Sequence, residues 1–264
     1  MSAGERARSR LRGCLLPALI LVGWELFARA EVVSPYLLPP FTEVVLSIGR
    51  MAADGSVLLH VAASGGRVLA GFVAGGALGI FVGFATGLSR RREAYFDPTI
   101  QAIRSIPSLA WVPLLLLWLG IGEASKVVLI AVGAFFPLYL SVFSAARNVD
   151  RKYLELGDVY GFSRADVIRR IIIPSAIPAL LTGLRTAAGV AWLYVVAAEL
   201  IAAHRGLGFL LTDGRELSRP DLVFASIFLL AMCGKLTDDA LKVVERRLTS
   251  WQPRPASRAI AADA

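Results

Sequence analysis

The sequence has very few of the residues that build disulfide frameworks, metal centres or histidine-based active sites. Its 264 residues include two cysteines, two histidines and three methionines. Cys14 and Cys233 stand alone in apolar surroundings, without the paired spacing of a disulfide framework or a zinc site. We therefore predict no catalytic residues, no metal site and no cofactor in this chain.

Sequence signatures of nucleotide and hydrolytic chemistry are also missing. There is no glycine-rich phosphate loop, and His60 and His204 cannot complete a His-Glu-x-x-His or Ser-His-Asp arrangement. We interpret both as solvated or satisfied histidines in or beside external loops. A membrane enzyme would need clustered catalytic groups, whereas the ionisable residues here are isolated. Lys and Arg gather in short clusters between apolar runs, which argues against a nucleic-acid partner.

Long apolar runs dominate the sequence: 56% of its residues are hydrophobic, although its formal net charge is +8. A bilayer core of about 30 Å needs about 20 apolar residues in a helix, because each backbone amide must be satisfied within the segment. We therefore predict an all-α integral membrane protein with about six transmembrane helices. They cover residues 14–30, 68–88, 103–119, 127–146, 179–202 and 222–244.

The distribution of positive charge predicts the topology. The arginine-rich start, the Ser89–Arg92 stretch, residues 147–170 and the tail carry most of the Lys and Arg, so these segments and both termini are expected in the cytoplasm, below a bacterial inner membrane. Residues 32–61 read as an external loop with an interfacial helix, and residues 248–264 as a disordered tail. The first helix is either retained as a signal anchor, which Glu25 favours, or cleaved after Ala30 as a signal peptide.

Two of the predicted spans carry unusual residues. The second has a glycine at every fourth position, which favours a helix-packing face over a glycine-lined substrate path. These glycines are Gly71, Gly75, Gly79, Gly83 and Gly87. The third span is interrupted by Pro107 and Pro113, and such a bent helix is expected to face the interior of the bundle. It either lines a transport path or is kinked only to aid packing.

Three charged residues lie in the predicted spans and are candidates for polar positions in the interior or along a path. Arg104 and Arg185 are expected near the cytoplasmic ends of their helices, as positive-inside anchors or as contacts for an anionic cargo. Glu199 is about 20 Å from Arg185 along one helix, so the two cannot pair. We predict that Glu199 faces a polar interior or a subunit interface.

The segment of residues 155–174, between the fourth and fifth spans, is too polar to cross a membrane. Gly161 can take the left-handed conformation that ends a first helix, over residues 153–160. Ser163 is a candidate N-cap for a second helix that ends before Pro174. The pair forms a helix-turn-helix, and its small face at Gly157 and Gly161 is suited to enter a groove on a cytoplasmic partner.

At this point the sequence resembles a known family. Glu155, Gly161, Ile171 and Pro174 have the spacing of the EAA loop of ABC importer permeases, although Leu156 and Gly157 stand where that pattern has two alanines. The segments GLSRRREAYFDPTIQAIRSIPSLAWVPLLLLWLGIGEASKVVLI and ARNVDRKYLELGDVYGFS are similar to the aliphatic sulfonate, taurine and nitrate permease group. Within that group the likeness to aliphatic sulfonate permeases is greatest.

The resemblance implies a type I ABC importer transmembrane domain over residues 61–247, after an N-terminal segment of residues 1–60. Residues from Glu155 to Pro174 would dock on the ATPase, which hydrolyses the ATP. The implied partners are an ATPase dimer, a second permease chain, a periplasmic or lipid-anchored substrate-binding protein and membrane lipid. The expected cargo is an aliphatic sulfonate, with taurine, nitrate or another small nutrient as alternatives. A membrane scaffold or anchor is the alternative from another functional class.

Overall fold

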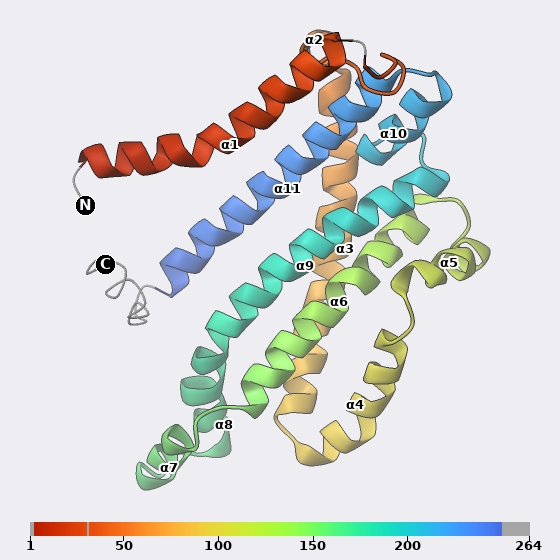
Figure 1. The fold of residues 1–264 in the computed structure, drawn as a ribbon. Helices are drawn as coiled ribbons and strands as arrows, with labels where there is room; N and C mark the ends of the chain where they lie inside the picture. The colour runs from red at the N-terminus through yellow and green to blue at the C-terminus, as the bar shows by residue number, and fades with distance from the viewer. Residues whose placement is uncertain (1–2, 31, 250–264) are drawn as a thin grey trace. The chain divides into compact units, whose positions relative to one another are not determined.

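The structure, a computed structural model, describes residues 3–30 and 32–249, which form helices joined by short turns and contain no β-strand (Figure 1). Two compact units are present. Residues up to 66 form the first together with residues 196–233, and residues 67–195 form the second together with those from 234 onward. Because α3 (Ser56–Gly87), α9 (Ile173–Ala202) and α11 (Pro220–Leu248) cross these limits, each contributes to both units.

The first unit is built around an aromatic cluster. Besides parts of the three long helices, it contains α1 (Ala3–Arg29), α2 (Phe41–Ala53) and α10 (Leu207–Glu216). The Trp24 ring lies 5.7 Å from that of Phe41 and 5.0 Å from that of Phe224. Its indole N–H donates to the carbonyl of Pro39 at 3.0 Å. Trp24 thereby joins α1, the turn before α2 and the start of α11.

In the second unit, α3 and α6 pack closely through glycine. Its helices are α4 (Arg90–Arg104), α5 (Val112–Leu119), α6 (Glu123–Arg147), α7 (Arg151–Val159) and α8 (Arg164–Val167), with a 3₁₀ turn over Ser108–Trp111 and a π turn over Ile168–Ile172. A Cβ at Gly75 would lie 2.0 Å from the carbonyl oxygen of Ala131. At Gly71, Gly79, Gly83 and Gly87 it would lie 2.6–2.9 Å from α6. A bulkier residue would force the two backbones apart.

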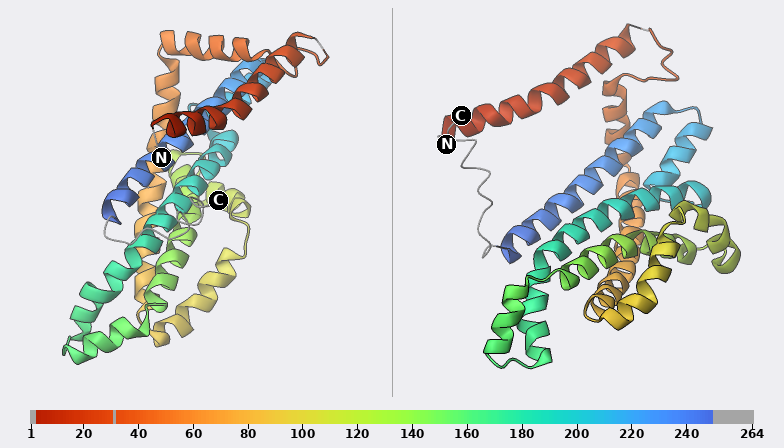
Figure 2. Two further views of the ribbon diagram at one scale, coloured as in Figure 1. Left: turned by 60° about the vertical axis from the view of Figure 1, so that its left-hand side comes forward. Right: turned by 60° about the horizontal axis from the view of Figure 1, so that its bottom comes forward.

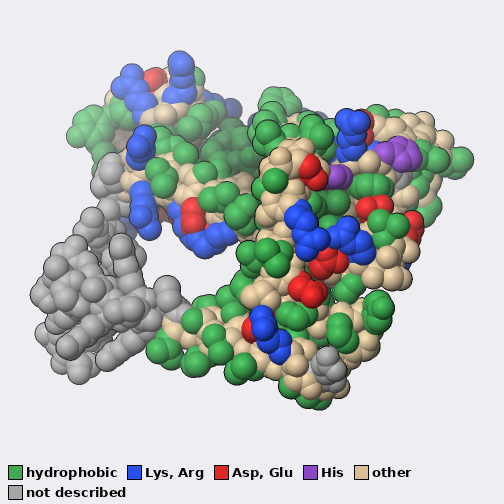
Figure 3. Space-filling view, turned by 90° about the horizontal axis from the view of Figure 1, so that it is seen from above, with side chains coloured by type: hydrophobic (Ala, Val, Ile, Leu, Met, Phe, Trp, Pro, Cys, Tyr) green, Lys and Arg blue, Asp and Glu red, His purple; other side chains and the backbone are tan. Residues whose placement is uncertain are grey.

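Several helices are long and apolar enough to cross a bilayer. Among the described residues there are four such helices, or five if the bent pair of α4 and α5 is counted as one span. The four are α3, α6, the helix over residues 164–201 and α11. The first predicted stretch, residues 14–30, falls on α1, which ends at Arg29 and is not among these candidates. Large apolar side chains are openly exposed, such as Leu117 at 79% and Phe81 at 72%, and green side chains cover much of the face in Figure 3. Such surfaces fit a multi-pass membrane protein.

The third predicted span was wrong in where it starts, whereas the predicted interruption at Pro107 is confirmed; Pro113 lies in the first turn of α5. Ser89 is the N-cap of α4 and accepts a hydrogen bond from the Arg92 N–H at 3.5 Å, so Arg90–Arg92 lie in the helix and not in a loop, and α4 ends at Arg104. The axis then bends by 81° between α4 and the segment that ends at Leu119, around Pro107. The apolar run alone did not reveal α4, because the helix is polar and its two acidic residues, Glu93 and Asp97, have their partners on α6.

Two further boundaries differ from the predictions. α3 begins at Ser56, so the predicted external loop over residues 32–61 is shorter. At the start of α3, hydrogen bonds from the Ser56 hydroxyl and N–H stabilise the Asp54 carboxylate and lower its pKa. The second loop helix does not end before Pro174. The π turn at Ile168–Ile172 widens the helix just ahead of Pro174, which accommodates its ring and its missing N–H. Residues 250–264 of the predicted tail lie outside the described residues.

Candidate functional site

The segment between α6 and α9 forms a hairpin, here called the coupling loop, residues 148–172. It projects beyond the ends of α6 and α9 in all three ribbon views (Figures 1 and 2). The Asp150 carboxylate caps α7 by accepting from the Lys152 N–H at 2.9 Å, and Ser163 caps α8 by accepting from the Asp166 N–H at 3.2 Å. Gly161 turns the chain with a φ of +64°, a left-handed conformation that favours glycine.

Gly157 lies inside the coupling loop. An added Cβ there would lie 3.0 Å from Cδ1 of Ile171 and 3.4 Å from Cγ2 of Val167. The structure therefore brings Gly157 and Ile171 together, and Pro174 starts α9 just beyond them. The expectation that Gly157 belongs to an outer face of small residues was wrong, because the side of α7 that carries Gly157 packs inside the hairpin.

The outer face of the coupling loop is apolar instead. Leu156 is 53% exposed, Val159 86% and Tyr160 68%. Glu155, also exposed, pairs with Arg151 on its own helix at 3.1 Å. Sequence reasoning missed Val159 and Tyr160, although their helical spacing from Leu156 was a visible signal.

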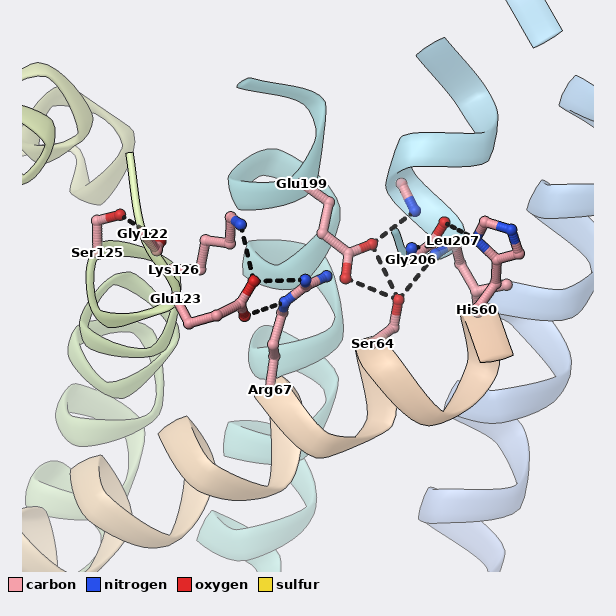
Figure 4. A network of polar contacts seen from close by, with 11 residues as sticks. His60, Ser64, Arg67, Gly122, Glu123, Ser125, Lys126, Glu199, Gly206 and Leu207 are labelled. Carbon is pink, nitrogen blue, oxygen red and sulfur yellow. Dashed lines mark hydrogen bonds and ion pairs between the residues drawn. The ribbon is translucent and has the colours of Figure 1, made fainter. Parts of the chain in front are cut away.

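In the first unit, Glu199 is the centre of a buried polar cluster (Figure 4). This carboxylate is 1% exposed and accepts from the Ser64 hydroxyl at 2.8 and 2.9 Å and from the Gly208 N–H at 2.7 Å. The Ser64 oxygen in turn accepts from the Leu207 N–H at 2.8 Å. Glu199 and Ser64 thus satisfy the first N–H groups of α10, which its own backbone cannot.

The turn into α10 depends on Gly206 and His60. Gly206 has a φ of +133°, and a Cβ there would lie 2.4 Å from the Glu199 carboxyl group. Its N–H donates to Nδ1 of His60 at 3.1 Å. His60 is thus a satisfied histidine that holds this turn.

Two ion-pair clusters in the second unit escaped the sequence analysis. Arg67 on α3 binds the Glu123 carboxylate through two nitrogens, at 2.6 and 2.7 Å, and Lys126 contacts the same group at 3.0 Å (Figure 4). These contacts join α3, at the first residue that it contributes to the second unit, to the start of α6.

The second cluster ties α9 to α11. The Arg185 guanidinium binds Asp238 at 2.9 Å and Glu245 at 3.1 Å. Lys242 completes the group beside Asp238. The spacing of residues 238, 242 and 245 places them on one helical face, which was the available signal.

The polar face of α4, residues Glu93, Asp97, Gln101 and Arg104, lies along α6. Glu93 pairs with Arg147 at 3.1 Å, and the Tyr139 hydroxyl donates to Asp97 at 2.7 Å. Gln101 donates to Asp97 at 3.3 Å and accepts from Arg104 at 3.3 Å. No residue of α4 is buried, and Arg104 is exposed.

No catalytic or metal-binding constellation was found in the described part of the chain. The residues searched there include no group of three or more His, Cys, Asp or Glu that could hold a metal ion. The polar clusters instead connect helices.

Comparison of the sequence with known proteins identifies the family. Residues 75–250 match the model of the binding-protein-dependent transport system inner membrane component. The chain is 39% identical over 249 residues to a Bacillus subtilis protein provisionally named aliphatic sulfonates transport permease protein SsuC, covering 94% of this chain and 90% of that protein. It is 38% identical to the taurine transport system permease protein TauC of Escherichia coli, covering 89% and 87% of the two chains.

A solved structure supports the fold. The described helices match a chain from a structure titled "Inward facing conformations of the MetNI methionine ABC transporter" with a TM-score of 0.59 and 21% identity, covering 74% of this chain and 95% of that chain. The fold is therefore that of a type I ABC importer transmembrane domain. With both comparisons in agreement, the chain belongs to the family of binding-protein-dependent transport system inner membrane components, as the permease subunit of an ABC importer whose partner ATPase hydrolyses the ATP.

Proposed function

We propose that this permease carries a small organic sulfonate, and that two copies of the chain enclose the path. The cargo proposal is carried by the relatives: permeases named for aliphatic sulfonates and for taurine match at 37–39% identity over at least 89% of the chain. Taurine is itself a sulfonate, so both names point to one headgroup. The bicarbonate transport system permease CmpB of Synechococcus elongatus is 28% identical.

The exposed end of the polar face of α4 supports the homodimer. Glu93 and Asp97 have partners on α6, whereas Arg104 at the end of this face is exposed and contacts no carboxylate among the described residues. Placing a charged group against hydrocarbon costs roughly several kcal/mol of free energy. A charged side chain at membrane depth therefore needs protein or water beside it. A second copy would cover this face and enclose an aqueous path. Light scattering of the purified permease should then give the mass of two chains.

We place both termini and the coupling loop on the cytoplasmic side, where the loop would dock on the ATPase. The positive-inside distribution of Lys and Arg supports this orientation. The exposed apolar side chains of Leu156, Val159 and Tyr160 offer the contact surface, since they have no cover in the described chain. Alternating access would follow when ATPase closure moves the hairpin and, through α9, the bundle.

Two variants separate docking from folding of the coupling loop. Val159→Asp changes an exposed position and should leave the permease folded while ATPase co-purification falls about tenfold or more. Gly157→Arg should split the hairpin, because its side chain would displace Ile171, and should lose both co-purification and the loop's resistance to protease. Normal co-purification and ATP hydrolysis in both variants would remove the loop from the coupling mechanism.

The cargo is tested with the reconstituted complex of permease, ATPase and binding protein in proteoliposomes. We expect saturable, ATP-dependent uptake of short alkanesulfonates, and stimulation of ATP hydrolysis by the sulfonate-loaded binding protein. Taurine, nitrate and bicarbonate serve as competing cargoes in parallel assays. Uptake of one of the two inorganic anions with no uptake of any sulfonate would contradict the proposal. A protein that responds to no small molecule would instead be a scaffold.

A further inference from the structure

Arg104, the last residue of α4, differs from the arginines that lie inside α3 and α9 in the second unit. Arg67 is bound by Glu123, and Arg185 by Asp238 and Glu245. Within the described residues, Arg104 contacts no carboxylate and has one hydrogen bond, to the Gln101 side chain at 3.3 Å. Four of its five N–H donors are therefore available at an exposed position.

The depth of Arg104 follows from α4 and α6. α4 begins at three consecutive arginines, residues 90–92, which suit the lipid headgroup level, and Arg104 is about 21 Å further along the axis. A second estimate uses α6: Tyr139, which contacts Asp97, is about 12 Å from Arg147, and Arg104 is about 10 Å beyond Asp97. Both place Arg104 well inside a bilayer core of about 30 Å, too deep to be the cytoplasmic anchor that the sequence suggested.

The direction of Arg104 is set by its own helix. Asp97, Gln101 and Arg104 follow one another at helical spacing, and Asp97 is turned toward α6 by the Tyr139 hydroxyl. Gln101 bridges Asp97 and Arg104, so it holds the guanidinium on the polar face without neutralising its charge. The α4 helix then breaks at Ser105–Pro107, and broken helices with polar faces are typical of cargo paths.

We propose that Arg104 is the anion-binding residue of the cargo path, where its guanidinium receives the sulfonate headgroup during translocation. The inference rests on the proposed sulfonate cargo and adds the position at which this headgroup is recognised inside the membrane. A planar guanidinium can donate two parallel hydrogen bonds to two sulfonate oxygens. Gln101 is its positioning residue.

The first experiment asks whether Arg104 faces water in the assembled complex, without using transport. Arg104→Cys and its control Ala102→Cys are made in a background with Cys14 and Cys233 replaced by serine. Ala102 is at nearly the same depth but about 200° around α4. We expect a membrane-impermeant thiol reagent to modify the cysteine at 104 at least about tenfold faster than that at 102. Equal rates at both positions would overturn the assignment.

The second experiment measures sulfonate uptake by the reconstituted complex. Arg104→Gln should lower uptake about tenfold or more while cargo-free ATP hydrolysis stays normal, because the loss of one charge-assisted contact is worth at least such a factor. Arg104→Lys should recover part of the rate. The control Arg92→Gln removes an equal charge in the exposed first turn of α4 and should transport normally.

The outcomes distinguish the two proposals. Normal sulfonate uptake by Arg104→Gln would overturn the role of Arg104 and leave the cargo proposal standing. If the wild-type complex imports only neutral or cationic solutes, both fall together. Failure of Arg104→Gln and Arg104→Cys to assemble with the ATPase would make the arginine a structural residue and would also overturn the assignment.

Discussion

Arg185, inside α9, and Arg104, the last residue of α4, are both arginines of the second unit, yet they have opposite surroundings. Arg185 is held between two carboxylates of α11, whereas Arg104 contacts only a neutral amide on an exposed helix face. Glu199 in the first unit resembles Arg185 in this respect, since its hydrogen bonds are made by groups of the same unit. A charge with partners in the chain ties helices together, and a charge without them is available to a ligand.

The same contrast separates closed and open helix faces. The α3–α6 face is closed by glycines that leave no space for a side chain, and the polar face of α4 has no buried residue at all. Substitutions on closed faces should therefore damage the fold first. Those on open faces should change transport or docking while the protein stays folded.

The largest effect is expected for Gly75→Leu on the closed face. The new Cβ would lie 2.0 Å from the Ala131 carbonyl oxygen, and backbone cannot move aside as a side chain can. We expect a loss of about 3 kcal/mol or more, seen as aggregation on size-exclusion chromatography in detergent. Gly66→Leu is the control on the same helix, where an added Cβ meets nothing within 4 Å. Equal behaviour of the two variants would contradict the close packing of α3 on α6.

A smaller loss is expected for Glu199→Gln. Glutamine keeps one acceptor but loses the charge and replaces the other oxygen with a donor, so the Ser64 and Gly208 contacts cannot both be kept as they are. We expect a loss of about 2 kcal/mol and faster hydrogen exchange of the first α10 amides. The exposed Glu216→Gln on α10 is the control. Unchanged insertion, assembly and transport would show that the buried carboxylate has no such role.

Arg185→Gln sharpens the comparison with Arg104 directly. Removing this cation leaves Asp238 and Glu245 with Lys242 as their neighbouring positive charge, so we expect a lower thermal midpoint in detergent. Sulfonate uptake per folded complex should fall by less than about threefold, because the ion pairs of Arg185 are partly exposed to solvent. If uptake instead fell as far as in Arg104→Gln with the thermal midpoint unchanged, the distinction between structural and available arginines would not hold.

Glu155→Ala should have the smallest effect. Glu155 pairs with Arg151 on its own exposed helix, and such pairs contribute little to stability. ATPase co-purification should stay normal, and cargo-stimulated ATP hydrolysis should change by less than about twofold. A tenfold loss in hydrolysis would indicate that the carboxylate contacts the ATPase directly.

The sequence predicted local features of the coupling loop better than its packing. Ser163 as an N-cap and the left-handed Gly161 were both identified, because capping and turn preferences act within a few residues. The position of Gly157 against Ile171 was not, since it depends on how two helices fold onto each other. Continuation of the helix through Pro174 was missed, because a π turn accommodates the proline and no sequence pattern predicts such a turn.

The candidate polar sites divide in the same way. Glu199 and Arg104 stood out in the sequence, because isolated charges in apolar runs are costly and therefore noticeable. Their partners did not: Ser64 is 135 residues away from Glu199, and Tyr139 is 42 away from Asp97. Only the folded chain brings such groups within hydrogen-bond distance.

By itself, the sequence determined the all-helical membrane class, the glycine face of α3 and the permease family, because these follow from composition, spacing and motif. Tertiary structure decided where α4 begins, which face of α7 is exposed and which charges are neutralised. The physical reason is that a polar residue stands out in an apolar sequence because burying it costs free energy, whereas its role depends on whether another helix supplies a partner. Arg185 and Arg104 look alike in the sequence, and only the carboxylates of α11 make one of them a structural tie.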